Sequence, residues 1–148
     1  MPRSFKFRFE QVLGVRRLKE DLAKRDLALA QLAVREQNQR IVRLLAEEDE
    51  GKDAIRGLKK NSVNIVQLRL QEGYLAALER RIREAAGRLQ ELGEVEAVKR
   101  QALADARREV RVLEKYRERQ LGAWRVGQDL AERKFLYEVS RYVAGMES

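Results

Sequence analysis

Apolar residues recur every seven positions through the second half of this 148-residue chain. One lattice contains Leu68, Leu75, Ile82, Leu89, Leu103, Val110, Trp124 and Ala131, and a second, offset by three positions, contains Leu78, Ala85, Leu92, Ala106 and Leu113. Two apolar positions per heptad form the seam along which α-helices pack in a coiled coil. Such a stretch needs a partner helix, so the expected fold class is all-α and the expected architecture is a long coiled coil.

A single break in the pattern supplies that partner helix from the same chain. Residues 57–64 read GLKKNSVN and collect residue types that favour turns. Asn61, Ser62 or Asn64 can cap a helix that starts there. We therefore expect one domain over residues 1–148, with a first helix over about 5–57, a turn over 58–64 and a second helix over about 65–144. Two long helices joined by a short turn form an antiparallel hairpin, here with a longer, overhanging second helix.

The first half of the chain has a looser repeat. Leu22, Ala33, Leu44 and Ile55 follow one another at eleven-residue intervals, and Leu18 and Leu29 share this spacing. An eleven-residue repeat is typical of a helix with little left-handed supercoiling. A bend near Asn61 then pairs Leu18 with Leu103, Leu29 with Leu92, Leu44 with Ala77 and Leu78, and Ile55 with Val66.

The N-terminus is rich in phenylalanine. Residues 5–9 read FKFRF and hold three of the four Phe residues in the chain. The alternation would suit a β-strand, but the sequence offers no second strand to satisfy its backbone groups. Phe5, Phe9 and Leu13 also share one helical face, with Ser4 placed as an N-cap, so we predict a helix. The Phe side chains are expected to pack on Val110, Leu113 and Tyr116, or to face a partner as well.

The composition excludes most catalytic chemistry. The chain has no Cys and no His, so it lacks disulfides, zinc-finger ligands and the usual nucleophile–base pairs. It has no P-loop motif, and the acidic run EEDE at residues 47–50 is expected to be a solvated face. We expect no enzymatic activity, cofactor, metal or small-molecule substrate. The sequence has no apolar run of membrane-spanning length and no secretion signal, so the cytoplasm is the expected location.

The charge is unevenly distributed. The formal net charge is +8, and residues 1–20 and 107–125 are both rich in Lys and Arg. The hairpin would bring these two basic segments together. Glu109, Glu114 and Glu118 interrupt the second one, which favours a salt-bridged or protein-binding face over nucleic-acid binding. Trp124 lies on the seam beyond the reach of the first helix. It can be a core residue of a self-associated bundle or an anchor for another protein.

Two segments resemble a known family. FKFRFEQVLGVRRLKEDLAKRDLALA (residues 5–30) and LEKYRERQLGAW (residues 113–124) are similar to the flagellar export protein FliJ, and the likeness covers nearly the whole chain. The resemblance implies a non-enzymatic component of the flagellar type III export apparatus, an α-helical hairpin like the central stalk of rotary ATPases. It would insert into the hexameric export ATPase, link it to the membrane export gate, handle export chaperones, and lie at the inner face of the membrane at the flagellar base.

The resemblance also suggests where the partners bind. The surface facing the ATPase ring would comprise Phe5, Phe7, Phe9, Arg16, Arg17, Arg107, Arg108, Arg111, Lys115, Arg119 and Trp124. The surface facing the export gate would comprise Leu44, Tyr74, Leu78 and Arg81. Two alternatives stay open: a basic coiled-coil nucleic-acid-binding or scaffold protein, and the equivalent stalk subunit of another secretion or rotary ATPase. The overhanging second helix could also self-associate.

Overall fold

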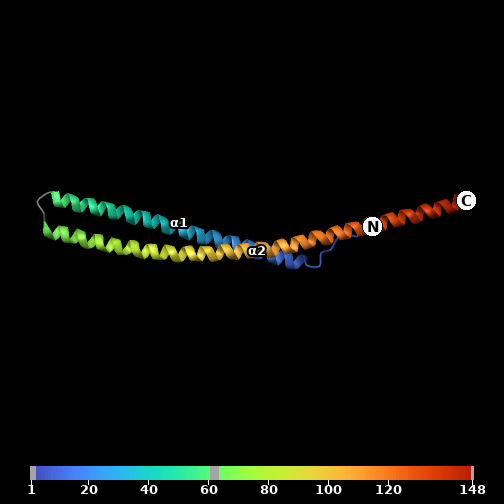
Figure 1. The fold of residues 1–148 in the computed structure, drawn as a ribbon, viewed down its shortest axis with the longest axis horizontal. Helices are drawn as coiled ribbons and strands as arrows, with labels where there is room; N and C mark the ends of the chain where they lie inside the picture. Colours follow the sequence, from blue (N-terminus) through green and yellow to red (C-terminus); the bar gives the residue numbers. More distant parts are fainter. Residues whose placement is uncertain (1–2, 61–63, 148) are drawn as a thin grey trace. The chain divides into compact units, whose positions relative to one another are not determined.

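Two long α-helices make up nearly all of the computed structural model, which describes residues 3–60 and 64–147 (Figure 1). Helix α1 spans Glu10–Lys60 and helix α2 spans Ile65–Glu147, with 51 and 83 residues. The described residues contain no β-strand. The predicted all-α fold with a longer second helix is therefore confirmed.

The start of α2 is fixed by a side-chain cap. The Asn64 side-chain oxygen accepts a hydrogen bond from the Val66 amide at 3.1 Å, and the Asn64 carbonyl accepts one from the Leu68 amide at 3.0 Å. This is the geometry of an N-cap residue, whose side chain satisfies an amide of the first turn. Asn64 is thus the cap among the three candidates, and Asn61 and Ser62 lie outside the described residues.

Helix α1 begins later than predicted. Its first residue is Glu10, whose amide donates to the Phe7 carbonyl at 3.2 Å, and residues 3–7 have no regular secondary structure. The prediction of a helix from residue 5 with Ser4 as its cap was wrong. The physical reason is a set of contacts between this segment and α2, described in the next subsection.

The chain divides into two compact units. The hairpin unit consists of residues 22–103, which include residues 22–60 of α1 and 65–103 of α2. The terminal unit consists of residues 1–21 and 104–148. In each unit the two helical segments run antiparallel, because partners further along α1 meet residues further back along α2. The Gln37–Ala85 hydrogen bond and the Leu44–Leu78 packing in the hairpin unit illustrate this order.

A small apolar cluster forms the core of the hairpin unit. Leu44, Leu78 and Ala85 are buried there, with Leu78 fully inaccessible, and Ile41 and Ile82 pack against them. The predicted meeting of Leu44 with Leu78 is therefore confirmed. Next to this cluster, the Gln37 side-chain amide donates a hydrogen bond to the Ala85 carbonyl at 3.0 Å. A polar side chain can occupy the seam here because it finds a backbone acceptor.

The eleven-residue repeat describes only part of the buried face of α1, since Ala33, Leu44 and Ile55 are buried or half-buried. Leu18, Leu22 and Leu29 are exposed, and Leu29 retains 57% of its accessible surface. Within the hairpin unit, the expected pairs Leu29–Leu92 and Ile55–Val66 are not confirmed, because Leu29 and Val66 stay largely exposed. Most buried and half-buried positions follow intervals of three and four, as in α2: Leu13, Arg16, Glu20, Ala23, Leu27, Ala30, Val34, Gln37, Ile41, Leu44, Glu48, Gly51, Ile55 and Leu58. Asp26, Gln31 and Ala33 are half-buried as well.

The predicted seam of α2 is correct over most of its length. Every lattice position from Leu68 to Leu113 is buried or half-buried, and Trp124 is half-buried. Ala131 does not continue the buried face, since every residue from 129 to 147 is exposed. The last five turns of α2 therefore overhang the packed part of the terminal unit, as the difference in helix length predicted.

Candidate protein-interaction site

Aromatic contacts hold the N-terminal segment, residues 3–9, against α2. Phe5 lies beside Trp124 with ring centroids 6.0 Å apart, and Phe7 and Phe9 lie 5.8 and 6.0 Å from the Tyr116 ring. Phe7 is buried, and its ring meets the edge of Phe9. The segment thus runs along α2 from Tyr116 toward Trp124 in the terminal unit.

The distance between Tyr116 and Trp124 explains why this segment is not helical. Eight residues of α2 cover about 12 Å, at 1.5 Å per residue. From Phe9 to Phe5 an extended chain spans up to about 13 Å, whereas a helix would span only about 6 Å. Only the extended form places Phe5 on Trp124 while Phe9 stays on Tyr116. Aromatic pairs at these separations contribute about 0.5–1.5 kcal/mol each beyond the area they bury.

Ion pairs join the two helical segments of the terminal unit. Four of them connect α1 to α2: Glu10–Arg117 at 3.1 Å, Arg17–Glu114 at 3.3 Å, Lys19–Glu109 at 3.7 Å and Glu20–Arg107 at 3.8 Å. Exposed pairs of this kind stabilise by about 0–1 kcal/mol each. Their main consequence is for availability, because the charges of Arg17 and Arg107 already have partners within the chain.

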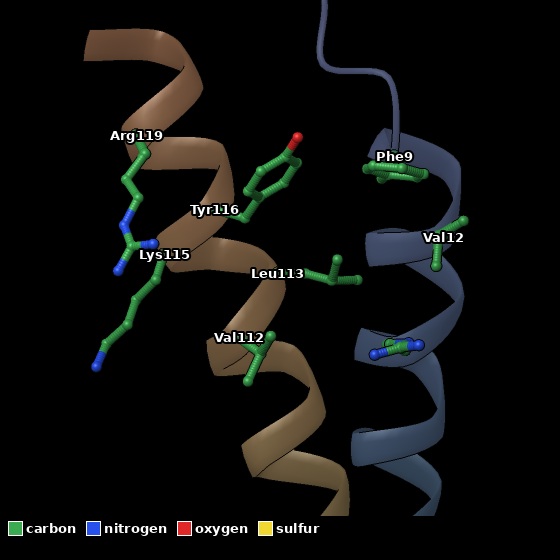
Figure 2. A pocket seen from close by; sticks show the side chains of 8 residues that line it. Phe9, Val12, Val112, Leu113, Lys115, Tyr116 and Arg119 are labelled. Carbon is green, nitrogen blue, oxygen red and sulfur yellow. The ribbon is translucent and has the colours of Figure 1, made fainter. Parts of the chain in front are cut away.

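An apolar groove lies between the start of α1 and the middle of α2 (Figure 2). Its volume is about 500 Å³, within the roughly 300–1,000 Å³ of typical ligand pockets. Leu113 and Tyr116 project from α2 toward α1, and Val12 of α1 and Phe9, just before α1, line the groove on the other side. The complete lining is apolar at its centre and cationic at its edges: Phe9, Val12, Val112, Leu113 and Tyr116, with Arg16, Lys115 and Arg119.

A row of cations continues from the groove along α2. Arg108, Arg111, Lys115 and Arg119 follow one another at intervals of three and four residues, which places them on one helical face. We call these four residues the basic stripe. Arg108 pairs with Asp105 of the same helix at 3.9 Å. Within the described part of the chain, no ion pair engages Arg111, Lys115, Arg119 or the nearby Arg16. A partner can therefore pair with Arg16, Arg111, Lys115 and Arg119.

The residues predicted to face an ATPase ring all lie in the terminal unit. The structure brings Phe5, Phe7, Phe9 and Trp124 into the aromatic cluster, and Arg16, Lys115 and Arg119 onto the rim of the groove. The groove also contains two residues that the sequence analysis did not single out, Val12 and Val112. Val112 could have been found, because with Tyr116 and Arg119 it forms a second stripe beside the seam at i, i+4 and i+7.

The residues predicted to face an export gate lie in the hairpin unit and differ in accessibility. Leu44 and Leu78 belong to its core. Tyr74 keeps 46% of its surface exposed, and Arg81 is exposed at the edge of a shallow polar depression that also includes Gln37, Arg40, Glu84, Ala85 and Arg88. A partner at this place can touch Tyr74 and Arg81 directly, while Leu44 and Leu78 support the helix beneath them.

Two other features, a metal site and a membrane-spanning helix, are absent from the described residues. Residues 3–60 and 64–147 contain no group of Asp and Glu side chains arranged to hold a metal ion. Over the same ranges, neither helix has a stretch that is both long and apolar enough to cross a membrane. What the described surface offers is therefore an apolar groove, an aromatic cluster and a basic stripe.

Comparison with known proteins gives one match. The family model described as the flagellar FliJ protein matches residues 5–145, nearly the whole chain. No curated protein and no solved structure matches the sequence.

Proposed function

The chain belongs to the FliJ family of flagellar proteins and is therefore a component of the flagellar protein export apparatus, and we propose that its terminal unit inserts into the hexameric export ATPase. In this proposal the hairpin unit contacts the membrane export gate through the surface around Tyr74 and Arg81. The protein would work without catalysing a reaction, would lie at the inner face of the membrane at the flagellar base, and would also bind export chaperones.

The availability of Arg111 and Lys115 in the basic stripe is the observation that carries the proposal. Cations that already pair with carboxylates of their own chain gain little from a partner, since the new pair only replaces the old one. Among the described residues, Arg111 and Lys115 have no such pair, unlike Arg108, and they lie beside an apolar groove. Charged residues around an apolar centre are the usual anatomy of a protein interface, in which the charges set orientation and association rate.

Stimulation of the cognate export ATPase tests the proposal. We expect the purified chain to raise ATP hydrolysis, and the double substitution Arg111→Glu and Lys115→Glu to weaken this effect roughly tenfold or more, because like charges then oppose the partner. Arg107 and Arg108 are left unchanged because they pair with Glu20 and Asp105. The matched control is Arg80→Glu with Arg83→Glu, which makes the same charge change on exposed residues of α2 but lies in the hairpin unit.

Two outcomes would contradict the proposal. The first is an unchanged hydrolysis rate on mixing the wild-type chain with its ATPase. The second is an equal loss of stimulation by both double variants, since that result would reflect net charge and not the basic stripe. Far-UV circular dichroism of each variant checks that the helices remain folded.

A further inference from the structure

The overhanging part of α2 exposes an apolar face. Phe135 and Tyr142 keep 63% and 70% of their surface exposed, although both are large aromatic residues. At 3.6 residues per turn, six large apolar side chains gather on about a third of the helix circumference. We call this set the C-terminal face: Phe135, Leu136, Val139, Tyr142, Val143 and Met146. Contiguous apolar surface of this kind marks an interaction site.

Carboxylates border the C-terminal face. Glu132 and Glu138 each lie three residues from Phe135, on its two sides along the chain, and Asp129 and Glu147 lie near the two ends of the face. The cations of the same segment, Arg133, Lys134 and Arg141, fall on the remaining part of the circumference. The C-terminal face is therefore apolar with an acidic border.

The groove of the terminal unit has the complementary character. Its centre is apolar and its rim carries Arg16, Lys115 and Arg119, none of which is engaged in an ion pair with a described carboxylate. The lengths match as well. From Val112 to Arg119, and from Phe135 to Tyr142, the helix advances seven residues, or about 10 Å. An amphipathic helix lying in an apolar groove is a common mode of recognition.

We propose that the C-terminal face of one copy of this chain docks in the groove of a second copy. The C-terminal face that fills the groove must belong to a second copy, because α2 is one continuous helix. Tyr116 in the groove and Val139 in the C-terminal face are 23 residues apart, or about 35 Å along that helix. Docking within one chain would require α2 to break and fold back.

The arrangement sets the strength and type of association. One groove about 10 Å long buries less surface than the roughly 1,200–2,000 Å² of stable complexes, so the contact should be weak and reversible. Each chain carries one groove and one C-terminal face. The contact therefore joins two different surfaces, and it continues from copy to copy unless a closed ring forms.

Mixing two variants of the full-length chain tests the proposal. The groove variant carries Lys115→Glu and Arg119→Glu, which place carboxylates against the acidic border. The face variant carries Phe135→Ser and Tyr142→Ser, at positions where exposure makes misfolding improbable. Sedimentation measures the average mass of each, alone and mixed in equal amounts, at roughly 10–200 μM, where a small interface should be partly occupied.

The expected results differ for each sample. The wild-type mass rises with concentration, and each variant alone stays at the monomer mass of 17.3 kDa. The equimolar mixture forms a dimer and goes no further, because only the groove of the face variant and the C-terminal face of the groove variant remain intact. A monomeric wild-type chain, or a mixture that stays monomeric while the wild type associates, would overturn the proposal. No ATPase is present, so the outcome is independent of the function proposed above.

Discussion

At the scale of single residues, Phe7 joins the N-terminal segment to α2. It is the only buried residue of the described N-terminal segment that precedes α1, and its ring contacts both Tyr116 and Phe9. Phe5 reaches Trp124 from the same extended backbone. Removing the Phe7 ring should therefore free the segment and uncover Trp124.

Trp124 fluorescence reports this coupling directly, because it is the chain's only Trp. We expect Phe7→Ala to shift the emission to longer wavelength, as the indole becomes more hydrated, while the helix content stays unchanged. The neighbouring Lys6→Ala is the matched control, since Lys6 is exposed. An emission maximum that is the same in Phe7→Ala, Lys6→Ala and the wild type would show that the segment stays in place without Phe7.

The conformation of this segment illustrates the limit of reading residues in isolation. FKFRFEQVL fits a period of two and also a helical spacing of four through Phe5, Phe9 and Leu13. The lack of a partner strand argues against a β-strand here, but it does not exclude an extended chain that is held by its side chains. The deciding feature is the distance of about 12 Å between Tyr116 and Trp124 on α2. The local sequence pattern around Phe5 and Phe9 does not contain this distance.

At the scale of helices, the polar and small residues of α1 explain which part of the seam was predictable. In α2 most seam positions hold Leu, Ile, Val or Ala, so the heptads were visible in the sequence. In α1 the same lattice includes Arg16, Glu20, Gln37, Glu48 and Gly51. Because these residues are polar or small, the heptad is not visible as an apolar repeat in α1. Exposed leucines such as Leu29 then suggest an eleven-residue repeat. The fold class survived this error because it rested on α2 and on the break near residue 60.

Gly51 gives a test of packing in the seam. A methyl group at this position would lie 3.5 Å from a terminal methyl carbon of Leu75, an ordinary van der Waals distance. Glycine in a helix interior is about 1 kcal/mol less favourable than alanine. We therefore expect Gly51→Ala to raise the free energy of unfolding by about 1.5 kcal/mol, of which helix propensity supplies about 1 kcal/mol and the added apolar contact the rest.

Gly87→Ala separates these two contributions. An added methyl at Gly87 meets nothing within 4 Å, so this variant should show the propensity gain without the contact. Urea unfolding followed by circular dichroism measures both. A destabilised Gly51→Ala beside a stabilised Gly87→Ala would mean that the two helices approach each other more closely at Gly51 than the structure shows.

At the scale of the whole molecule, folding and recognition use different parts of the chain. Buried side chains occur between Phe7 and Val110, and the last nineteen described residues, 129–147, have none. A helix without tertiary packing is only marginally stable in water, even at this length. The end of α2 should therefore contribute little to the stability of the fold, and its exposed aromatic residues point to a role in binding.

Amide hydrogen exchange on the full-length chain can test this division. We expect residues 129–147 to exchange fast at low protein concentration, as expected for locally opening segments, and the α2 core around Leu78 and Ala85 to exchange slowly. If the C-terminal face docks in a second copy, protection of 129–147 should rise with concentration while that of the core stays constant. A tail as protected as the core in dilute solution would contradict the division, because its backbone would then need a stabilising contact within one chain.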